Sequence, residues 1–284
     1  MLKSFFFNII YFLYRSRLLN SRITVLSIDD TINELLSTNK SMVRFGDGEI
    51  ALIADHDIPL QNKNSELSER MKTILKDNRQ DLIVTLPDIF VRLDEYAGST
   101  QAFYKKHLFF RRRTYENICR NKTYYNTAIS RPYIEYKDLT THSKYFEMIK
   151  PLWNQREIVF IEGAVSHNGV DNDLFDNAIS IERIICPSRD AYKKYDEILN
   201  ECMKLDKSKL LLITIGATSK PLVIDLDNAG YRAIDLGNLD MEYGWYLEGT
   251  THKTPVAKHN IKTYEENLVA GYTEYLSQII ARIS

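Results

Sequence analysis

Cysteine is scarce in this chain, and the few cysteines lie far apart. Cys119, Cys186 and Cys202 are the three among 284 residues. An odd number at such wide spacing matches neither a zinc-binding pattern nor a disulfide framework. The sequence therefore predicts a protein of a reducing compartment, the cytoplasm.

Net charge and the common nucleotide-binding motifs are also missing. The chain carries 37 basic and 38 acidic side chains, so no overall field attracts nucleic acid. No Gly-x-Gly-x-x-Gly motif is present, and residues 216–220 lack the glycine spacing of a P-loop. An ATPase or a dinucleotide-binding enzyme is therefore a weak interpretation.

One basic and aromatic segment, Lys105–Arg113, stands out in this neutral chain. No recognised nucleic-acid-binding module accompanies it, and we expect no nucleic-acid partner. The segment is either a solvated helix face or a surface that meets a phosphorylated, lipid-linked or membrane-bound acceptor.

No hydrophobic run is long enough to span a membrane. Phe5–Tyr14 is apolar but covers half of the roughly 20 residues that a span requires. Arginines follow it, with no acidic residue before Asp29 and no small-residue cleavage site of a signal peptide. Residues 1–26 are therefore either a helix at a membrane surface or a helix packed on the protein itself or on a second subunit. We expect one catalytic domain at 27–284.

Hydrophobic patterning alternates between strands and helices along the chain. Short buried runs predict strands at Met42–Arg44, Leu82–Leu86, Ile158–Ile161, Ile181–Cys186, Leu210–Ile215 and Arg232–Asp235. Helical spacing predicts helices over 28–36 (capped by Ser27 and Asp30), 67–75, 191–202 and 217–229, an irregular one over Ala102–Tyr125, and a long one over Thr263–Ile283. The alternation predicts an α/β, Rossmann-like fold: a mostly parallel sheet with helices on both faces.

An acidic motif follows the first long predicted strand. Arg44–Ile50 reads Arg-Phe-Gly-Asp-Gly-Glu-Ile. At this spacing Asp47 and Glu49 share one face of a strand end or converge in a tight loop. Such a pair suits one hard divalent cation, which prefers oxygen ligands and keeps open positions for a phosphate. Gly46 and Gly48 let the backbone approach a ligand. The alternative is a polar turn with solvated carboxylates.

Four further polar loops begin where predicted strands end. They start at Glu162-Gly163, Pro187-Ser188, Gly216 and Asp235. In open parallel sheets, ligands bind beyond the carboxyl ends of strands, and a helix beginning at Gly216 suits an anion. Each loop alone is ordinary turn chemistry. Together with the Asp47 loop they favour a nucleotide-type site.

The order of these motifs resembles the GT-D fold glycosyltransferases, a bacterial family first catalogued as a domain of unknown function. The resemblance rests on Arg44–Glu49, Ser130–Tyr133, Asn172–Ala178, Ile184–Pro187, and Gly216–Thr218 through Asp235–Gly237 to Glu242–Tyr243, over about residues 27–247. It implies a Rossmann-like GT-D fold and transfer of a hexose from a UDP-sugar with a divalent metal, Mn²⁺ or Mg²⁺. The apolar segment before Ser27 lies outside it.

The resemblance carries an Asp-x-Glu metal motif onto Asp47 and Glu49. Arg44 and Arg131 are candidates for the diphosphate, since guanidinium matches phosphate geometry; the alternative for each is a structural ion pair, which the sequence favours for Arg131. The expected substrate-binding residues are Arg44, Gly46, Gly48, Arg131, Glu162, Gly163, Asn172, Asp173, Pro187, Ser188, Gly216 and Thr218. Asp240 and Glu242 form a second acidic pair at a strand end. One of them orients the acceptor hydroxyl or acts as base, or else the pair caps a helix or forms a salt bridge. His252 and His259 are further candidates for the metal shell.

These observations lead to one hypothesis and two alternatives. The first is a cytoplasmic, metal-dependent UDP-hexose transferase that builds a surface polysaccharide or glycoprotein glycan. We expect a glycan acceptor, lipid-linked if the enzyme works peripherally at the inner membrane face, and we keep a homo-oligomer open. The alternatives are a metal-dependent phosphohydrolase or nucleotidyltransferase acting on nucleotide sugars, and a non-catalytic subunit that binds nucleotide sugars.

Overall fold

The computed structural model describes residues 2–19, 22–256, 258 and 271–284. Within these residues the chain forms one sheet of nine strands in the order β1-β4-β3-β2-β8-β7-β5-β6-β9. Every pair of neighbouring strands is parallel. The predicted α/β fold with a mostly parallel sheet is confirmed.

The strands are short and mostly buried. They are β1 (Thr24–Val25), β2 (Ser41–Arg44), β3 (Leu82–Leu86), β4 (Thr123–Asn126), β5 (Glu157–Gly163), β6 (Ser180–Cys186), β7 (Leu210–Thr214), β8 (Arg232–Asp235) and β9 (Ile279–Arg282). All residues of β2 and β3 are buried, as expected of parallel strands covered on both faces.

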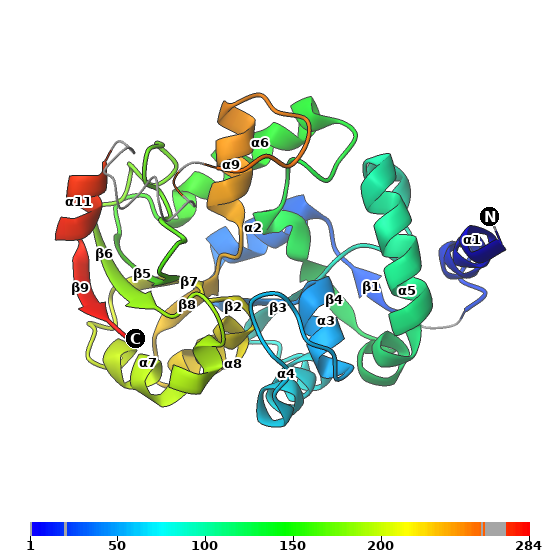
Figure 1. Ribbon diagram of the computed structural model, residues 1–284, viewed down its shortest axis with the longest axis horizontal. Helices are drawn as coiled ribbons and strands as arrows, with labels where there is room; N and C mark the ends of the chain where they lie inside the picture. Colours follow the sequence, from blue (N-terminus) through cyan, green and yellow to red (C-terminus); the bar gives the residue numbers. More distant parts are fainter. Residues whose placement is uncertain (1, 20–21, 257, 259–270) are drawn as a thin grey trace.

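Helices cover both faces of this sheet (Figure 1). They are α1 (Leu2–Arg15), α2 (Ile28–Ser37), α3 (Asp47–Ile53), α4 (Ser65–Asp77), α5 (Gly98–Cys119), α6 (Leu139–Ile149), α7 (Tyr195–Cys202), α8 (Ser219–Asn228), α9 (Leu239–Leu247) and α11 (Tyr272–Ser277). Helices α4, α7 and α8 contact one another below the sheet in Figure 1, and α2 packs with α6 above it. The predicted cap of α2 is confirmed, because the Ser27 hydroxyl accepts from the Asp30 amide and Asp30 bonds back to Ser27.

Two helix predictions are wrong in part. The stretch Ala102–Tyr125 divides into α5 and the strand β4, separated by Asn121 at a positive φ of 60°. The predicted tail helix is also wrong where the structure describes it. Helix α11 is short, and Ile279–Arg282 then pairs with β6, consistent with the strand preference of isoleucine. Residues 263–270 lie outside the described residues.

The N-terminal segment takes part in the fold. Thr24–Val25 adds strand β1 to β4, and α1 packs along α5. The Tyr14 hydroxyl donates to Glu116, and Phe7 meets Phe109 with 5.1 Å between ring centroids. The division at residue 26 stays a prediction. In the described part of the chain, no helix combines the length and apolarity that a membrane span requires.

Candidate active site

The acidic motif opens a helix rather than a loop. Asp47 and Glu49 occupy the first turn of α3, directly beyond β2, so the predicted strand-end or tight-loop geometry is wrong. Residues two apart on a helix do not face each other. Glu49 turns back to accept from the Gly46 amide at 2.8 Å, and a carboxylate is favourable at this end of a helix.

A buried lysine joins Glu49 to the end of β8. Lys220 Nζ lies 2.9 Å from Glu49 and 3.0 Å from Asp235, and it also donates to the Gly216 carbonyl. Burial alone would raise the pKa of Glu49, but the Lys220 ammonium, the Gly46 amide and the Arg44 charge together outweigh burial and hold that pKa below its usual value. Glu49 is therefore ionised, and each of its oxygens has a partner: Lys220 at Oε1 and the Gly46 amide at Oε2.

Asp47 has a different environment. Among the described residues it forms no ion pair, and burial together with the Glu49 charge raises its pKa. The Arg131 charge acts in the opposite direction. A second positive charge placed beside Asp47 would relieve this repulsion, which is the electrostatic signature of a cation site.

A metal site at Asp47 and Glu49 stays a prediction, because Asp47 forms no ion pair among the described residues whereas Lys220 and the Gly46 amide already contact Glu49. No group of three or more His, Cys, Asp and Glu side chains suited to a metal occurs in the described part of the chain. Mg²⁺-type cations often bind through one or two carboxylates plus substrate phosphates, so the donor set fits such an ion. His252 is exposed and is not placed in any such group, and His259 lies outside the described residues.

Arg44 reaches the same place from β2. Its side chain is 10% exposed and lies 3.9 Å from Asp235, and its Nε has no hydrogen-bond partner among the described residues. Gly237 has a φ of 58°, and a Cβ built there would come within 1.8 Å of the guanidinium. Gly237 is thus the residue that lets Arg44 lie over the loop after β8.

The two carboxylates of the second acidic pair, Asp240 and Glu242, differ in their hydrogen-bond partners. Both lie in the first turn of α9 rather than at a strand end. Asp240 accepts from the Gly169 amide and Asn172, and it lies 2.5 Å from Lys258. Asp240 is therefore part of a paired network that ties α9 to the loop after β5.

Glu242 is buried but only half bonded. Its Oε2 accepts from the amides of Tyr133 and Ile134, while Oε1 has no hydrogen-bond partner among the described residues. Burial raises the pKa of Glu242 to about 7, against the opposing effect of these amides and of Arg131. A carboxyl group that titrates near neutrality is suited to take a proton.

The loops beyond β5, β6 and β7 meet closely. A Cβ at Gly163 would lie 3.4 Å from the Ser188 Cα, so glycine allows the loops after β5 and β6 to touch. The buried hydroxyls of Ser188 and Thr218 have no hydrogen-bond partner in the described residues. Gly216, at a φ of 61°, is exposed beside them and starts the turn into α8.

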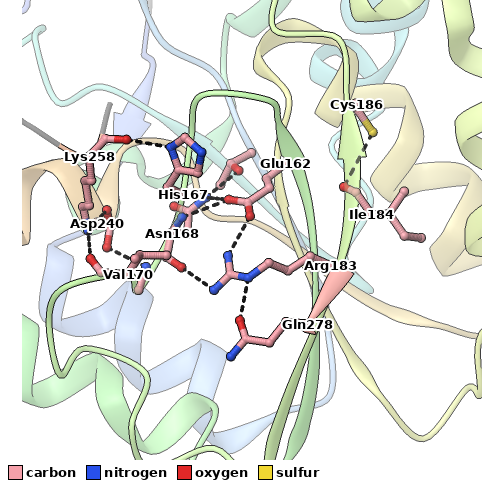
Figure 2. A network of polar contacts seen from close by, with 12 residues as sticks. Glu162, His167, Asn168, Val170, Arg183, Ile184, Cys186, Asp240, Lys258 and Gln278 are labelled. Atoms are coloured by element: carbon pink, nitrogen blue, oxygen red, sulfur yellow. Dashed lines mark hydrogen bonds and ion pairs between the residues drawn. The ribbon is translucent and has the colours of Figure 1, made fainter. Parts of the chain in front are cut away.

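Glu162 sits inside the protein rather than on this surface (Figure 2). One oxygen lies 2.6 Å from Arg183, and the other accepts from the amide and side chain of Asn168. Arg183 also donates to Gln278 at 2.7 Å. Because both Glu162 oxygens are engaged and the residue is fully buried, this geometry gives no support to direct donor contact by Glu162.

The remaining predicted residues are spread around the site. Arg131 pairs with Glu135 at 3.0 Å, and the Glu242 and Asp47 charges add to the effect of Glu135 in raising the pKa of Arg131. Asn172 donates to Asp240, and the exposed Asp173 accepts from Tyr243. Pro187 is half-buried and precedes Ser188, while Gly48 opposes Ile58.

Lys220, Arg183 and Asn168 are not among the site residues predicted from the sequence. A signal exists for two of them. Lys220 follows Gly216 by one helical turn, so its side chain can return to the strand end. Arg183 interrupts the apolar run of β6, and a charge in a buried strand needs a partner. Its partners cannot be read from the sequence.

A family model described as glycosyltransferase GT-D fold matches residues 42–265. This chain belongs to that family. The GT-D assignment agrees with solved structures. The chain matches a domain of unknown function 1792 described as having a distinct glycosyltransferase fold, at 42% identity and a TM-score of 0.88, covering 96% of this chain and 100% of that one. A glycosyltransferase from Streptococcus sanguinis matches at 40% identity and a TM-score of 0.86, covering 92% and 100%.

Two streptococcal proteins are similar in sequence. They are the probable glycosyl transferase Gly of Streptococcus gordonii, 40% identical over 267 residues, and the glycosyltransferase GlyD of Streptococcus pneumoniae, 39% identical over 267 residues. The matches cover 93% and 92% of this chain but 39% and 33% of those proteins. The chain thus spans less than half the length of either relative.

Proposed function

We propose that this chain transfers a hexose from a UDP-sugar to a glycan acceptor, in the synthesis of a surface polysaccharide or a glycoprotein glycan. The observation that carries the proposal is the setting of Asp47. Its carboxylate begins a helix beyond β2, forms no ion pair among the described residues, and has Arg131 near it, while Arg44 and Lys220 lie beside the neighbouring Glu49. Family membership supplies the reaction class.

The chemistry requires charge stabilisation on the leaving group. The acceptor oxygen forms a bond to the anomeric carbon, the bond from that carbon to the β-phosphate oxygen breaks, and its electron pair leaves with UDP. A divalent cation held by Asp47 and Glu49 would neutralise charge on the diphosphate. Arg44 supplies fixed positive charge at the same place, and its buried, unbonded Nε is a donor suited to a phosphate oxygen.

We assign the acceptor's proton to Glu242 rather than to Asp240. Glu242 has an oxygen with no hydrogen-bond partner among the described residues and a pKa near 7, whereas Asp240 is paired with Lys258. The Arg131 guanidinium interacts electrostatically with both Asp47 and Glu242. The proposed proton acceptor, Glu242, and the carboxylate proposed to act on the leaving group, Asp47, are therefore both near Arg131.

Product analysis tests the proposal. Purified protein with Mn²⁺ or Mg²⁺ is incubated with UDP-glucose, UDP-galactose and their N-acetylated counterparts, and nucleotide products are separated by chromatography. We expect UDP. Release of UMP or a sugar phosphate would favour a phosphohydrolase or nucleotidyltransferase, and absence of any product above background would favour a non-catalytic binding subunit.

We also propose that the enzyme works in the cytoplasm at an anionic membrane surface. Tyr11 and Tyr14 bury one face of α1 on the protein, while Phe5, Ile9 and Phe12 leave the other face exposed. Phe110 continues this apolar surface on α5, and its flanks carry Arg17, Lys106 and Arg113, all exposed. Each basic residue near an anionic surface contributes about 1 kcal/mol of binding.

Vesicle flotation tests the membrane proposal. The double variant Phe5→Ser/Phe12→Ser should lose binding to phosphatidylglycerol vesicles, whereas Leu60→Ser, at an exposed leucine elsewhere, should retain it. Added salt should weaken wild-type binding. Failure of the wild type to bind these vesicles at low salt, or formation of a dimer that depends on Phe5 and Phe12, would overturn it.

A further inference from the structure

A cavity of about 130 Å³ lies beside the candidate active site at the carboxyl edge of the sheet. Its lining includes Asp88, just beyond β3, Asn126 at the end of β4, and Asp29 in the first turn of α2. Strands β3, β4 and β1 are neighbours in the sheet. Ligands of open parallel sheets bind at this edge, so the cavity occupies a place where a substrate can sit.

Asp88 is a buried carboxyl group with unused bonding capacity. It is 3% exposed, and neither oxygen accepts a hydrogen bond from any described residue. Arg92 Nε lies 3.3 Å away but meets Asp88 as an ion pair only. A buried polar group without hydrogen bonds costs about 1–3 kcal/mol, so its presence calls for an explanation.

A second polar atom at the same cavity has no partner either. His142 Nδ1 is buried and forms no hydrogen bond with a described residue. Its ring stacks on Tyr136 at 3.7 Å between centroids, and Tyr136 stacks on Tyr96 at 4.6 Å. Two further lining residues are bonded to each other: the Tyr145 hydroxyl donates to the Asp29 carboxylate at 2.7 Å. The cavity thus combines an aromatic lining with two polar side chains, Asp88 and His142, that together have three atoms without a hydrogen-bond partner among the described residues.

The order of the strands shows on which side of the candidate active site the cavity lies. The loops with the buried Ser188 and Thr218 hydroxyls follow β6 and β7, on one side of β2 and the start of α3. The Asp88 cavity follows β3, β4 and β1, on the other side. A nucleotide over β7 and β6 with its diphosphate at β8 and β2 would direct its sugar toward β3, where an acceptor must approach.

We propose that this cavity receives one hydroxyl-bearing edge of a pyranose ring of the acceptor glycan. Sugar hydroxyls donate to the Asp88 oxygens and to His142 Nδ1, the polar atoms of this lining that have no hydrogen-bond partner among the described residues. The volume equals the share of about four water molecules, enough for one face of a small polyol to enter. The assignment of this sugar to the acceptor rests on the proposed glycosyl transfer. The inference that the cavity binds a pyranose is independent of that proposal.

Direct binding of simple glycosides tests the cavity. Methyl glycosides of glucose, galactose, N-acetylglucosamine and N-acetylgalactosamine are titrated against the wild type by saturation-transfer NMR, with glycerol as a non-cyclic comparison. We expect at least one glycoside to bind. Asp88→Asn should weaken it about tenfold, because the variant replaces one of the two accepting oxygens by an amide that only donates. Asp225→Asn, which removes a carboxylate paired with Arg70 away from the cavity, should not.

A second variant and a separate donor assay make every outcome decisive. His142→Gln should weaken the same glycoside, and circular dichroism shows whether each variant folds. The KM for UDP-sugar in acceptor-free hydrolysis should stay within about twofold in both. If no glycoside binds the wild type, or if folded Asp88→Asn and His142→Gln bind like wild type, the cavity inference is wrong. If glycosides bind through Asp88 but UDP is never released, the site stands and the glycosyl transfer fails.

Discussion

The carboxyl edge of this sheet contains two regions that use similar residues in opposite ways. Over β5 and β6, Glu162, Arg183 and Asn168 bond to one another and fill almost all of their hydrogen-bonding positions (Figure 2). Over β3, β2 and β8, Asp88, Asp47 and Glu242 lack such complete pairing among the described residues. We call these sets the paired network and the open carboxylates.

The difference teaches how to separate structural from functional acids in one fold. Burial raises the pKa of all three open carboxylates, to about 7 for Asp88 and Glu242. Each therefore costs folding free energy, which a purely structural group would not be expected to do. The paired network instead positions the loop after β5 and, through Asp240 and Lys258, helix α9.

The largest expected effect concerns Asp47. Asp47→Asn should lower acceptor-dependent UDP release by about 100-fold or more, comparable to loss of a major electrostatic contact in a transition state. Its free energy of unfolding at pH 7 should be unchanged or higher, because the variant removes a carboxylate whose pKa is raised. Steady-state kinetics and urea unfolding measure the two quantities. Near-normal activity would remove Asp47 from the reaction.

A substitution in the paired network should lower the stability of the fold and leave the activity of the folded protein nearly unchanged. Glu162→Gln leaves Arg183 buried without its counter-charge, and breaking such a pair typically costs about 3–5 kcal/mol. We expect a large fall in the urea midpoint and near-normal turnover per folded molecule. Active-site titration corrects for the folded fraction. A stable but inactive variant would instead place Glu162 among the substrate contacts.

The third effect is a change in pH dependence at Glu242. Its folded-state pKa of about 7 exceeds the ordinary 4.5, so the folded protein holds this proton more tightly than the unfolded chain. The contribution of Glu242 to the free energy of unfolding is therefore fully present below about pH 4.5. It is lost as the pH rises through 7, by about 3 kcal/mol in total.

Glu242→Gln should accordingly flatten the fall in unfolding free energy between pH 5 and pH 8. It should also remove the rise in transfer rate through pH 7 that a general base produces. Unfolding curves and kcat/KM profiles across this range check both. An Asp240→Asn variant that flattened them equally would show that the two acids are not distinct.

The smallest expected effect is at Asp173, a predicted substrate contact. It is exposed and bonds to Tyr243 and Lys150, and exposed pairs of this kind contribute about 1 kcal/mol or less. Asp173→Asn should change neither the stability by more than this nor the KM for UDP-sugar by more than about twofold. A larger rise in KM would move Asp173 into the donor site.

Sequence predicts the parts of this molecule that local patterning determines. The apolar runs of β3 and β7 and the capped start of α2 are visible in the sequence. Strands β4 and β9 are missed because their sequences are short and mixed, and pairing with a neighbouring strand decides their state. Tertiary pairing overrides local preference in such segments.

The candidate site divides in the same way. Asp47 and Glu49 stand out because their motif is contiguous in sequence. Lys220 and Asp88 do not, because their roles depend on charges and cavities that distant segments bring together. No local pattern distinguishes an aspartate that keeps an unused oxygen from one that pairs.

One thermal-shift experiment tests the contrast between the two regions most directly. Wild type, Asp47→Asn and Glu162→Gln are each melted with and without UDP and Mn²⁺, since a ligand stabilises a protein according to its affinity for the folded state. We predict that Asp47→Asn keeps the wild-type melting temperature and loses the ligand-induced rise, while Glu162→Gln melts lower and keeps the rise. The reverse pattern, with ligand response lost in Glu162→Gln and retained in Asp47→Asn, would contradict the account.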